Sequence, residues 1–88
     1  MNYLHYELDV GPNDAIEVTL DHAANVQLMD STNFYNYKEG RAFRYYGGYV
    51  KTSPYRLRAP NQGSWYLAID LGGNSGTVRA SVRVLKSS

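Results

Sequence analysis

Cysteine does not occur in this 88-residue chain, and histidine occurs only at His5 and His22. Without cysteine there is neither a disulfide framework nor a set of thiolate ligands for a metal. A catalytic nucleophile needs a base within reach, but His5 is expected to point outward from a strand and His22 to lie in a tight turn. The pair Asp21-His22 has no evident third or fourth metal ligand. We therefore expect no enzymatic activity, no catalytic or metal-binding residues and no cofactor.

Long apolar runs are also missing. No stretch approaches the ~20 apolar residues of a membrane helix, and the first residues lack the basic and apolar regions of a secretory signal. The expected location is therefore the cytoplasm, without membrane contact. A length of 88 residues suits one domain, spanning residues 1–88, rather than two.

Strict alternation of apolar and polar side chains is the main pattern present. Alternating runs cover residues 4–10, 16–21, 26–28, 56–58, 65–71 and 78–84. A period of two places one set of side chains inside and the other in water, as in half-buried antiparallel strands. Turns rich in Asn, Gly and Pro separate the runs at intervals of about 8–12 residues. The sequence therefore predicts an all-β fold, a small antiparallel β-sandwich or flattened barrel of about seven or eight short strands.

The segment Gly72-Gly73-Asn74-Ser75-Gly76 is rich in glycine. Glycine-rich loops bind phosphate when a helix follows them, because the helix N-terminus supplies N–H groups. Here an alternating run follows instead. We therefore expect a hairpin turn and not a phosphate-binding loop.

Residues 34–49 depart from the alternating pattern. They contain five of the nine tyrosines and both phenylalanines, with arginine and glycine between them. We expect a loop over residues 34–41, with a short helical turn at 34–39, and then a strand over 42–46. A Gly47-Gly48 turn and a short edge strand over 49–52 follow.

This aromatic segment has the composition of a recognition surface. Tyrosine supplies large contact area at low entropic cost, and Asn and Gly adapt around it. Arginine contacts anions and stacks on aromatic rings. The candidate contact residues are Tyr35, Tyr37, Arg41, Arg44, Tyr46 and Tyr49.

A purely structural role for the aromatic residues stays open. Phe43 and Tyr45 would then point inward and fill the core, while Tyr35 and Tyr37 pack over an open end of the sandwich. Trp65 heads an alternating run with inward phase, so we expect it in the core.

Charge is distributed unevenly along the chain. The net charge is +1, but residues 1–37 carry about −6 and residues 38–88 about +7. Cross-strand pairing between the two halves would neutralise these charges within the fold. Alternatively, the late strands form a basic face for an anionic partner. The candidate basic face comprises Lys51, Arg56, Arg58, Arg79 and Arg83.

Several segments resemble a known family of bacterial proteins. The resemblance is carried by residues 21–30, 40–48, 53–57, 70–73 and 78–84. Together they resemble the domain-of-unknown-function family 1883. The resemblance implies an all-β fold that occurs alone or joined to a Toll/interleukin-1-receptor-like (TIR) domain. It also implies an accessory role in TIR-type bacterial signalling, and it brings no catalytic or binding residues.

We therefore hypothesise a non-catalytic recognition or interaction module for an unknown protein or small ligand. The alternative is a single-stranded nucleic-acid-binding β domain, in which basic residues and exposed aromatic rings act together and affinity falls with salt. A homo-oligomer formed through the edge strand at 49–52, which precedes Pro54, is a further possibility.

Overall fold

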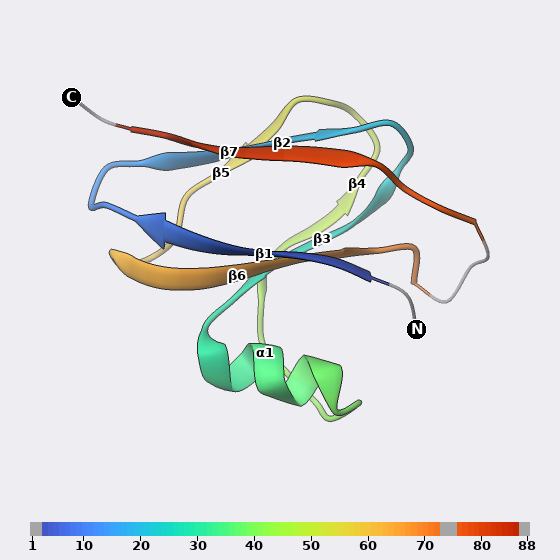
Figure 1. Ribbon diagram of the computed structural model, residues 1–88, viewed down its shortest axis with the longest axis horizontal. Helices are drawn as coiled ribbons and strands as arrows, with labels where there is room; N and C mark the ends of the chain where they lie inside the picture. Colours follow the sequence, from blue (N-terminus) through green and yellow to red (C-terminus); the bar gives the residue numbers. More distant parts are fainter. Residues whose placement is uncertain (1–2, 73–75, 87–88) are drawn as a thin grey trace.

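Two antiparallel sheets stack on one another, and a helix covers the outer face of one of them (Figure 1). This computed structural model describes residues 3–72 and 76–86. The four-stranded sheet has the order β1-β6-β3-β4, formed by Tyr3–Val10, Gly63–Asp70, Ala24–Met29 and Tyr46–Val50. The three-stranded sheet has the order β5-β2-β7, formed by Tyr55–Leu57, Ala15–Leu20 and Ala80–Leu85. Helix α1 spans Ser31–Lys38. The predicted all-β sandwich is confirmed, with the sheets stacked rather than closed into a barrel.

The main core lies between the two sheets and follows the alternation of the sequence. Its fully buried members include Ile16, Val18, Val26, Leu28, Leu67 and Ile69. Neighbouring strands place these residues opposite one another, as in the pairs Val26 with Ile69 and Leu28 with Leu67. Each buried side chain of this size contributes roughly 1.5–3 kcal/mol, so period-two patterning specifies both register and stacking face.

Helix α1 begins and ends with local signals that its sequence carries. The Asp30 carboxylate caps the N-terminus by accepting a 2.8 Å hydrogen bond from the backbone N–H of Asn33. At the other end Gly40 adopts φ 73°. The backbone N–H of Arg41 then donates to the Asn36 carbonyl over 2.8 Å, the closing bond of a Schellman motif.

Three expectations for residues 34–49 are wrong. The helical turn expected at 34–39 is part of the longer helix α1, so most of the expected loop is helical, and the predicted strand over residues 42–46 is instead irregular until Tyr46. Gly47-Gly48 is not a turn, because β4 runs straight through it. The physical reason lies at Gly47, which has φ 127° and where a Cβ atom would overlap the Val26 carbonyl oxygen. Glycine is needed here for close approach of two strands.

The helix packs on the outer face of the four-stranded sheet (Figure 1). Phe34 and Tyr37 are its buried residues and contact a second cluster that includes Met29 and Ala68. The Phe34 ring stacks on Tyr66 with centroids 4.7 Å apart. Within residues 3–72 and 76–86, no helix has the length and apolar character needed to span a membrane.

The expected hairpin at residues 72–77 is also wrong. Strand β6 belongs to the four-stranded sheet and β7 to the three-stranded one, so the intervening chain crosses between sheets. Residues 73–75 themselves lie outside the described part. Alternation alone could not show this, because both strands alternate whichever sheet they join.

Candidate functional site

A cleft of about 680 Å³ opens beside the N-terminus of α1. Three parts of the chain converge on it: residues 29–33, the segment that leads into β4, and the β5–β6 connection with the start of β6. Its lining includes Asn33, Arg44, Tyr45, Tyr46, Asn61 and Trp65. The volume lies in the range of ligand-binding clefts.

Arg44 is held in the cleft through its backbone and not through its side chain. Its backbone N–H donates to Asn33 Oδ1 over 2.8 Å. Asn33 is itself fixed, because its Nδ2 donates to Asp30 Oδ1 over 3.0 Å. Within the described residues, no hydrogen bond or ion pair engages the Arg44 guanidinium. The charged head is therefore available to a ligand while its attachment point is fixed.

Aromatic rings form much of the remaining wall. Trp65 is only 8% exposed, and its indole Nε1 donates to the Asn61 carbonyl over 2.9 Å. The Tyr46 ring meets Trp65 edge to face, with centroids 6.1 Å apart. Tyr46 and its neighbour Tyr45 are 52% and 46% exposed. The cleft wall thus combines the exposed rings of two tyrosines with a buried tryptophan whose indole N–H is already hydrogen-bonded.

Of the two charged groups in the cleft lining, one already has hydrogen-bond partners among the described residues and the other does not. Only Asp30 and Arg44 among the lining residues carry charge. The Asp30 carboxylate already accepts hydrogen bonds from the backbone N–H and Nδ2 of Asn33. The Arg44 guanidinium is therefore the charge that an anionic ligand would meet.

The structure brings only some of the predicted contact residues together. Arg44 and Tyr46 both line the cleft. Tyr35 lies on the exposed side of α1, where the Arg41 guanidinium sits 5.8 Å from its ring centroid. Tyr49 is 62% exposed on β4 and does not line the cleft.

Tyr37, the sixth predicted contact, is buried and belongs to a polar network under α1. Its hydroxyl donates to Asp70 Oδ2 over 2.6 Å, and Tyr37 is 5% exposed. The same carboxylate accepts from Asn25 Nδ2 and from the backbone N–H of Gly72, each over 2.9 Å. Burial, followed by the adjacent Asp70 carboxylate, raises the pKa of Tyr37 well above its usual range. Tyr37 therefore fastens the helix to the sheet.

Two residues of the predicted basic face form cross-strand ion pairs. Glu17 on β2 lies opposite Arg56 on β5 and Arg83 on β7. Its carboxylate oxygens accept from Arg56 Nε over 2.9 Å and from Arg83 Nε over 2.7 Å. These hydrogen bonds, the one from Arg83 first, lower the pKa of Glu17. The two arginines are therefore paired within the three-stranded sheet.

The other three basic residues of the candidate face each lie just outside a strand. Lys51 follows β4, where its Nζ sits 6.0 Å from the Tyr49 ring centroid. Arg58 follows β5 and Arg79 precedes β7, and both are exposed. All five residues of the candidate basic face are thus exposed, and two of them, Arg56 and Arg83, are paired with Glu17.

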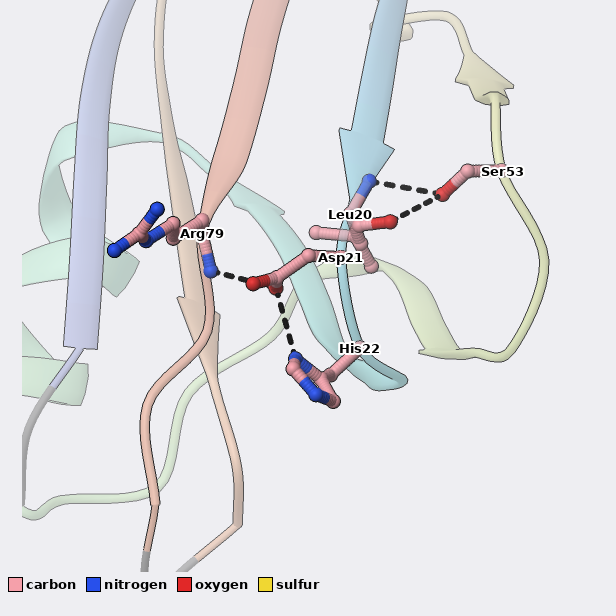
Figure 2. A network of polar contacts seen from close by, with 5 residues as sticks. All are labelled: Leu20, Asp21, His22, Ser53 and Arg79. Carbon is pink, nitrogen blue, oxygen red and sulfur yellow. Dashed lines mark hydrogen bonds and ion pairs between the residues drawn. The ribbon is translucent and has the colours of Figure 1, made fainter.

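The Asp21-His22 pair forms part of a structural corner at the end of β2 (Figure 2). His22 Nδ1 lies 3.1 Å from Asp21 Oδ1, which also accepts from the Arg79 backbone N–H over 2.7 Å. The Arg79 contact is the main cause of the lowered pKa of Asp21. Beside it, Ser53 Oγ bonds both the backbone N–H and the carbonyl of Leu20. No group of three or more metal-ligating side chains occurs in the described residues.

Only Arg44 and Tyr46 of the ten lining residues were predicted contacts, and the residues missed include Asn33, Tyr45, Asn61 and Trp65. Trp65 was expected in the core, and it is indeed buried, yet one side of it reaches the cleft. A signal for Tyr45 was present, because adjacent residues of an extended chain point to opposite faces and Tyr45-Tyr46 cannot both fill one core.

Comparison with known proteins places the chain in a family without identifying its ligand. Neither a curated protein nor a solved structure matches the chain. The model of one family, described as a domain of unknown function (DUF1883), matches residues 1–88. The chain therefore belongs to this family, and the resemblance seen in its sequence motifs is confirmed.

Proposed function

We propose that this domain is a non-catalytic recognition module that binds an anionic group of a partner molecule in the Arg44 cleft. The observation that carries the proposal is the guanidinium of Arg44, which has no partner within the described residues and shares a cleft with the exposed rings of Tyr45 and Tyr46.

The chemistry of these groups favours an anion with adjoining flat or apolar surface. A guanidinium presents a rigid fork of donors that matches a carboxylate or a phosphate. Tyrosine rings add contact area and lose few rotamers on binding. Because Asn33 already holds the Arg44 backbone, less ordering of the chain remains to oppose binding.

The family resemblance implies one setting for such a module. Beside a TIR domain, a cleft that binds an anionic partner would act as the sensor or accessory part of a bacterial signalling protein. In a cytoplasmic protein the partner would be another protein or a small ligand.

Trp65 makes the proposal directly testable, because it is the one tryptophan of the chain and lines the cleft. Poly-L-glutamate is titrated into the protein while Trp65 emission is followed. We expect saturable binding that weakens at least about tenfold in Arg44→Gln, the loss of roughly 1.4 kcal/mol. Arg58→Gln is the matched control, since Arg58 is exposed but outside the cleft. Equal weakening in both variants, or none in Arg44→Gln, would refute the role of the cleft.

Single-stranded nucleic acid is the second candidate. The half-exposed rings of Tyr45 and Tyr46 beside Arg44 support it, because bases stack on such rings. Two residues of the candidate basic face, Arg56 and Arg83, are engaged by Glu17. A labelled oligothymidylate separates the candidates. Binding that needs Tyr46 and falls steeply with salt would favour nucleic acid, and no binding at low salt would exclude it.

A further inference from the structure

The free edge of β4 differs from the other sheet edges of the described residues. Strand β4 pairs with β3 on one side and with no described strand on the other. Edge strands are usually protected by charge, brevity or a covering group. Lys86 Nζ covers the β1 edge by donating to the Asp9 carbonyl over 3.2 Å. Strand β5 is only three residues long, and β7 carries Arg83.

Strand β4 has none of these protections. Its sequence is Tyr-Gly-Gly-Tyr-Val, without charge or proline, and the side chains of Tyr46 and Tyr49 are more than half exposed. Such an edge is able to pair with an extended segment of another molecule.

Gly48 adds a second observation. Unlike Gly47, it does not have a positive φ, and a Cβ atom placed there would meet nothing within 4 Å. The fold therefore does not require glycine at this position. Its small size leaves the surface of β4 bare, as where another backbone or a ligand comes close.

The edge and the cleft are continuous, because Tyr46 both begins β4 and lines the cleft. A segment paired along β4 would reach the cleft at the Tyr46 end. Its side chain at that point would lie within reach of Arg44, the residue two positions earlier in the chain.

We infer that the cleft and the β4 edge together bind an acidic, extended polypeptide segment, which adds to the four-stranded sheet as a further strand. The inference rests on the proposed function and names the class of partner. Charge complementarity favours this occupant. Arg44 precedes β4 and Lys51 follows it, and the residues between them carry no charge, so both ends of this edge are basic.

A second copy of the chain fits this edge less well. Antiparallel pairing of two β4 strands would bring the Arg44 end of one copy beside the Lys51 end of the other. Like charges directly opposite one another destabilise strand pairing.

Four short peptides test the inference against the native protein by Trp65 emission. The first is a capped heptapeptide of alternating glutamate and valine. The second replaces glutamate by lysine. The third keeps the acidic sequence but carries N-methyl groups on every second backbone nitrogen, which blocks the N–H donors along one edge of the extended peptide. The fourth carries the methyl groups on the remaining nitrogens, which blocks the other edge. We expect the acidic peptide to bind best, with at least tenfold loss for the lysine peptide and for one of the N-methylated forms, because methylation removes the strand's hydrogen-bond donors.

Two variants that place opposite charges at Gly48 test whether the bound peptide lies along β4. Gly48→Glu and Gly48→Lys place chains of comparable length into the same open space. Both should keep the thermal midpoint of the native protein. The glutamate variant should bind the acidic peptide at least tenfold more weakly than the lysine variant. Equal affinities would show that the peptide does not lie along β4 and would overturn the inference.

The outcomes separate this inference from the proposed function. Undiminished binding of both N-methylated peptides overturns strand addition but leaves anion binding at Arg44 intact. Unchanged affinity of the acidic peptide for Arg44→Gln overturns the role of the cleft itself. No binding of the acidic peptide refutes strand addition, while the poly-L-glutamate titration decides separately on Arg44. A dimer that Gly48→Glu dissociates would assign the edge to a second copy and overturn the acidic partner.

Discussion

At the scale of single residues, Asp70 shows how this fold accommodates a buried charge. The residue is 3% exposed, and its carboxylate receives donors from the Tyr37 hydroxyl, Asn25 and the Gly72 backbone. A buried carboxylate needs such donors, because the loss of water is otherwise uncompensated. Helix α1 supplies one of these donors through Tyr37, so it contributes to satisfying the buried carboxylate.

Removal of one donor should have a measurable cost. In Tyr37→Phe the ring stays and the hydroxyl is lost, so Asp70 keeps its burial with one donor fewer. We expect the free energy of unfolding in urea to fall by about 1.5–3 kcal/mol, as for hydrogen bonds to charged groups. Tyr35→Phe on the exposed side of α1 is the control and should change it by less than about 0.5 kcal/mol. Equal effects would show that the bond to Asp70 contributes nothing specific.

Glu17 should make the stability of the folded protein fall at low pH. Hydrogen bonds from Arg83 and Arg56 hold its pKa below the ordinary value. A carboxyl with a lowered folded pKa stabilises the protein fully above its unfolded pKa of about 4.3, and this contribution is lost as pH falls through the folded pKa. The thermal midpoint of Glu17→Gln should lie below that of the native protein at pH 7, and the two should converge in acid. A difference that stays constant down to about pH 2.5 would contradict this origin.

At the scale of elements, alternation predicted the strands that fill the core but not α1. The helix buries only Phe34 and Tyr37, and two positions in eight residues do not establish a period of 3.6. The stronger signals were local. Asp30 stands at the N-cap and Gly40 at the left-handed position after the C-cap, and together they bracket the helix. The aromatic composition between them obscured this bracket.

Strand β4 shows the same limit in another form. Two adjacent glycines usually indicate a turn, yet only tertiary contact distinguishes their roles. Gly47 is required because β3 comes too close for a side chain, whereas Gly48 faces open space. The different roles of the two glycines therefore depend on how β4 lies against β3. The sequence of β4 alone does not reveal this contact.

The two glycines should respond oppositely to alanine. Gly47→Ala should lower the free energy of unfolding by more than about 2 kcal/mol, because it combines a positive φ with a backbone clash. Gly48→Ala should leave it unchanged or raise it by about 0.4–1 kcal/mol, since a less flexible unfolded chain loses less entropy. Urea unfolding of the two variants and the native protein measures the contrast. Similar losses in both would mean that Gly48 is also under steric constraint.

At the scale of the whole molecule, the fold neutralises some of the unevenly distributed charges of the sequence and leaves others without partners in the part of the chain that the structure describes. Part of it is neutralised across the three-stranded sheet, where Glu17 pairs with Arg56 and Arg83. Another part stays around β4 and the cleft, where the Arg44 guanidinium has no partner within the described residues. The sequence could not separate these outcomes, because which strands become neighbours is a property of the topology. Composition did single out Arg44 and Tyr46, but only the fold shows that Tyr37 is buried away from them.

This division predicts opposite effects of salt on two kinds of association. Binding of an acidic peptide at β4 should weaken as salt screens its attraction to Arg44 and Lys51. Self-association through β4 would instead strengthen, because salt screens the repulsion between the basic ends of two copies. Light scattering should therefore give the mass of a monomer, 9.9 kDa, at about 0.05 M salt, with any dimer growing towards about 1 M.

A dimer present at low salt and dissociated by high salt would contradict this picture. It would indicate head-to-tail pairing of the β4 edge with the acidic β1 edge, which carries Glu7 and Asp9 and is covered by Lys86. Such pairing does not close on itself and would extend the four-stranded sheet from copy to copy. The lysine at position 86 would then be the group that a second copy displaces, and Lys86→Ala would strengthen the assembly.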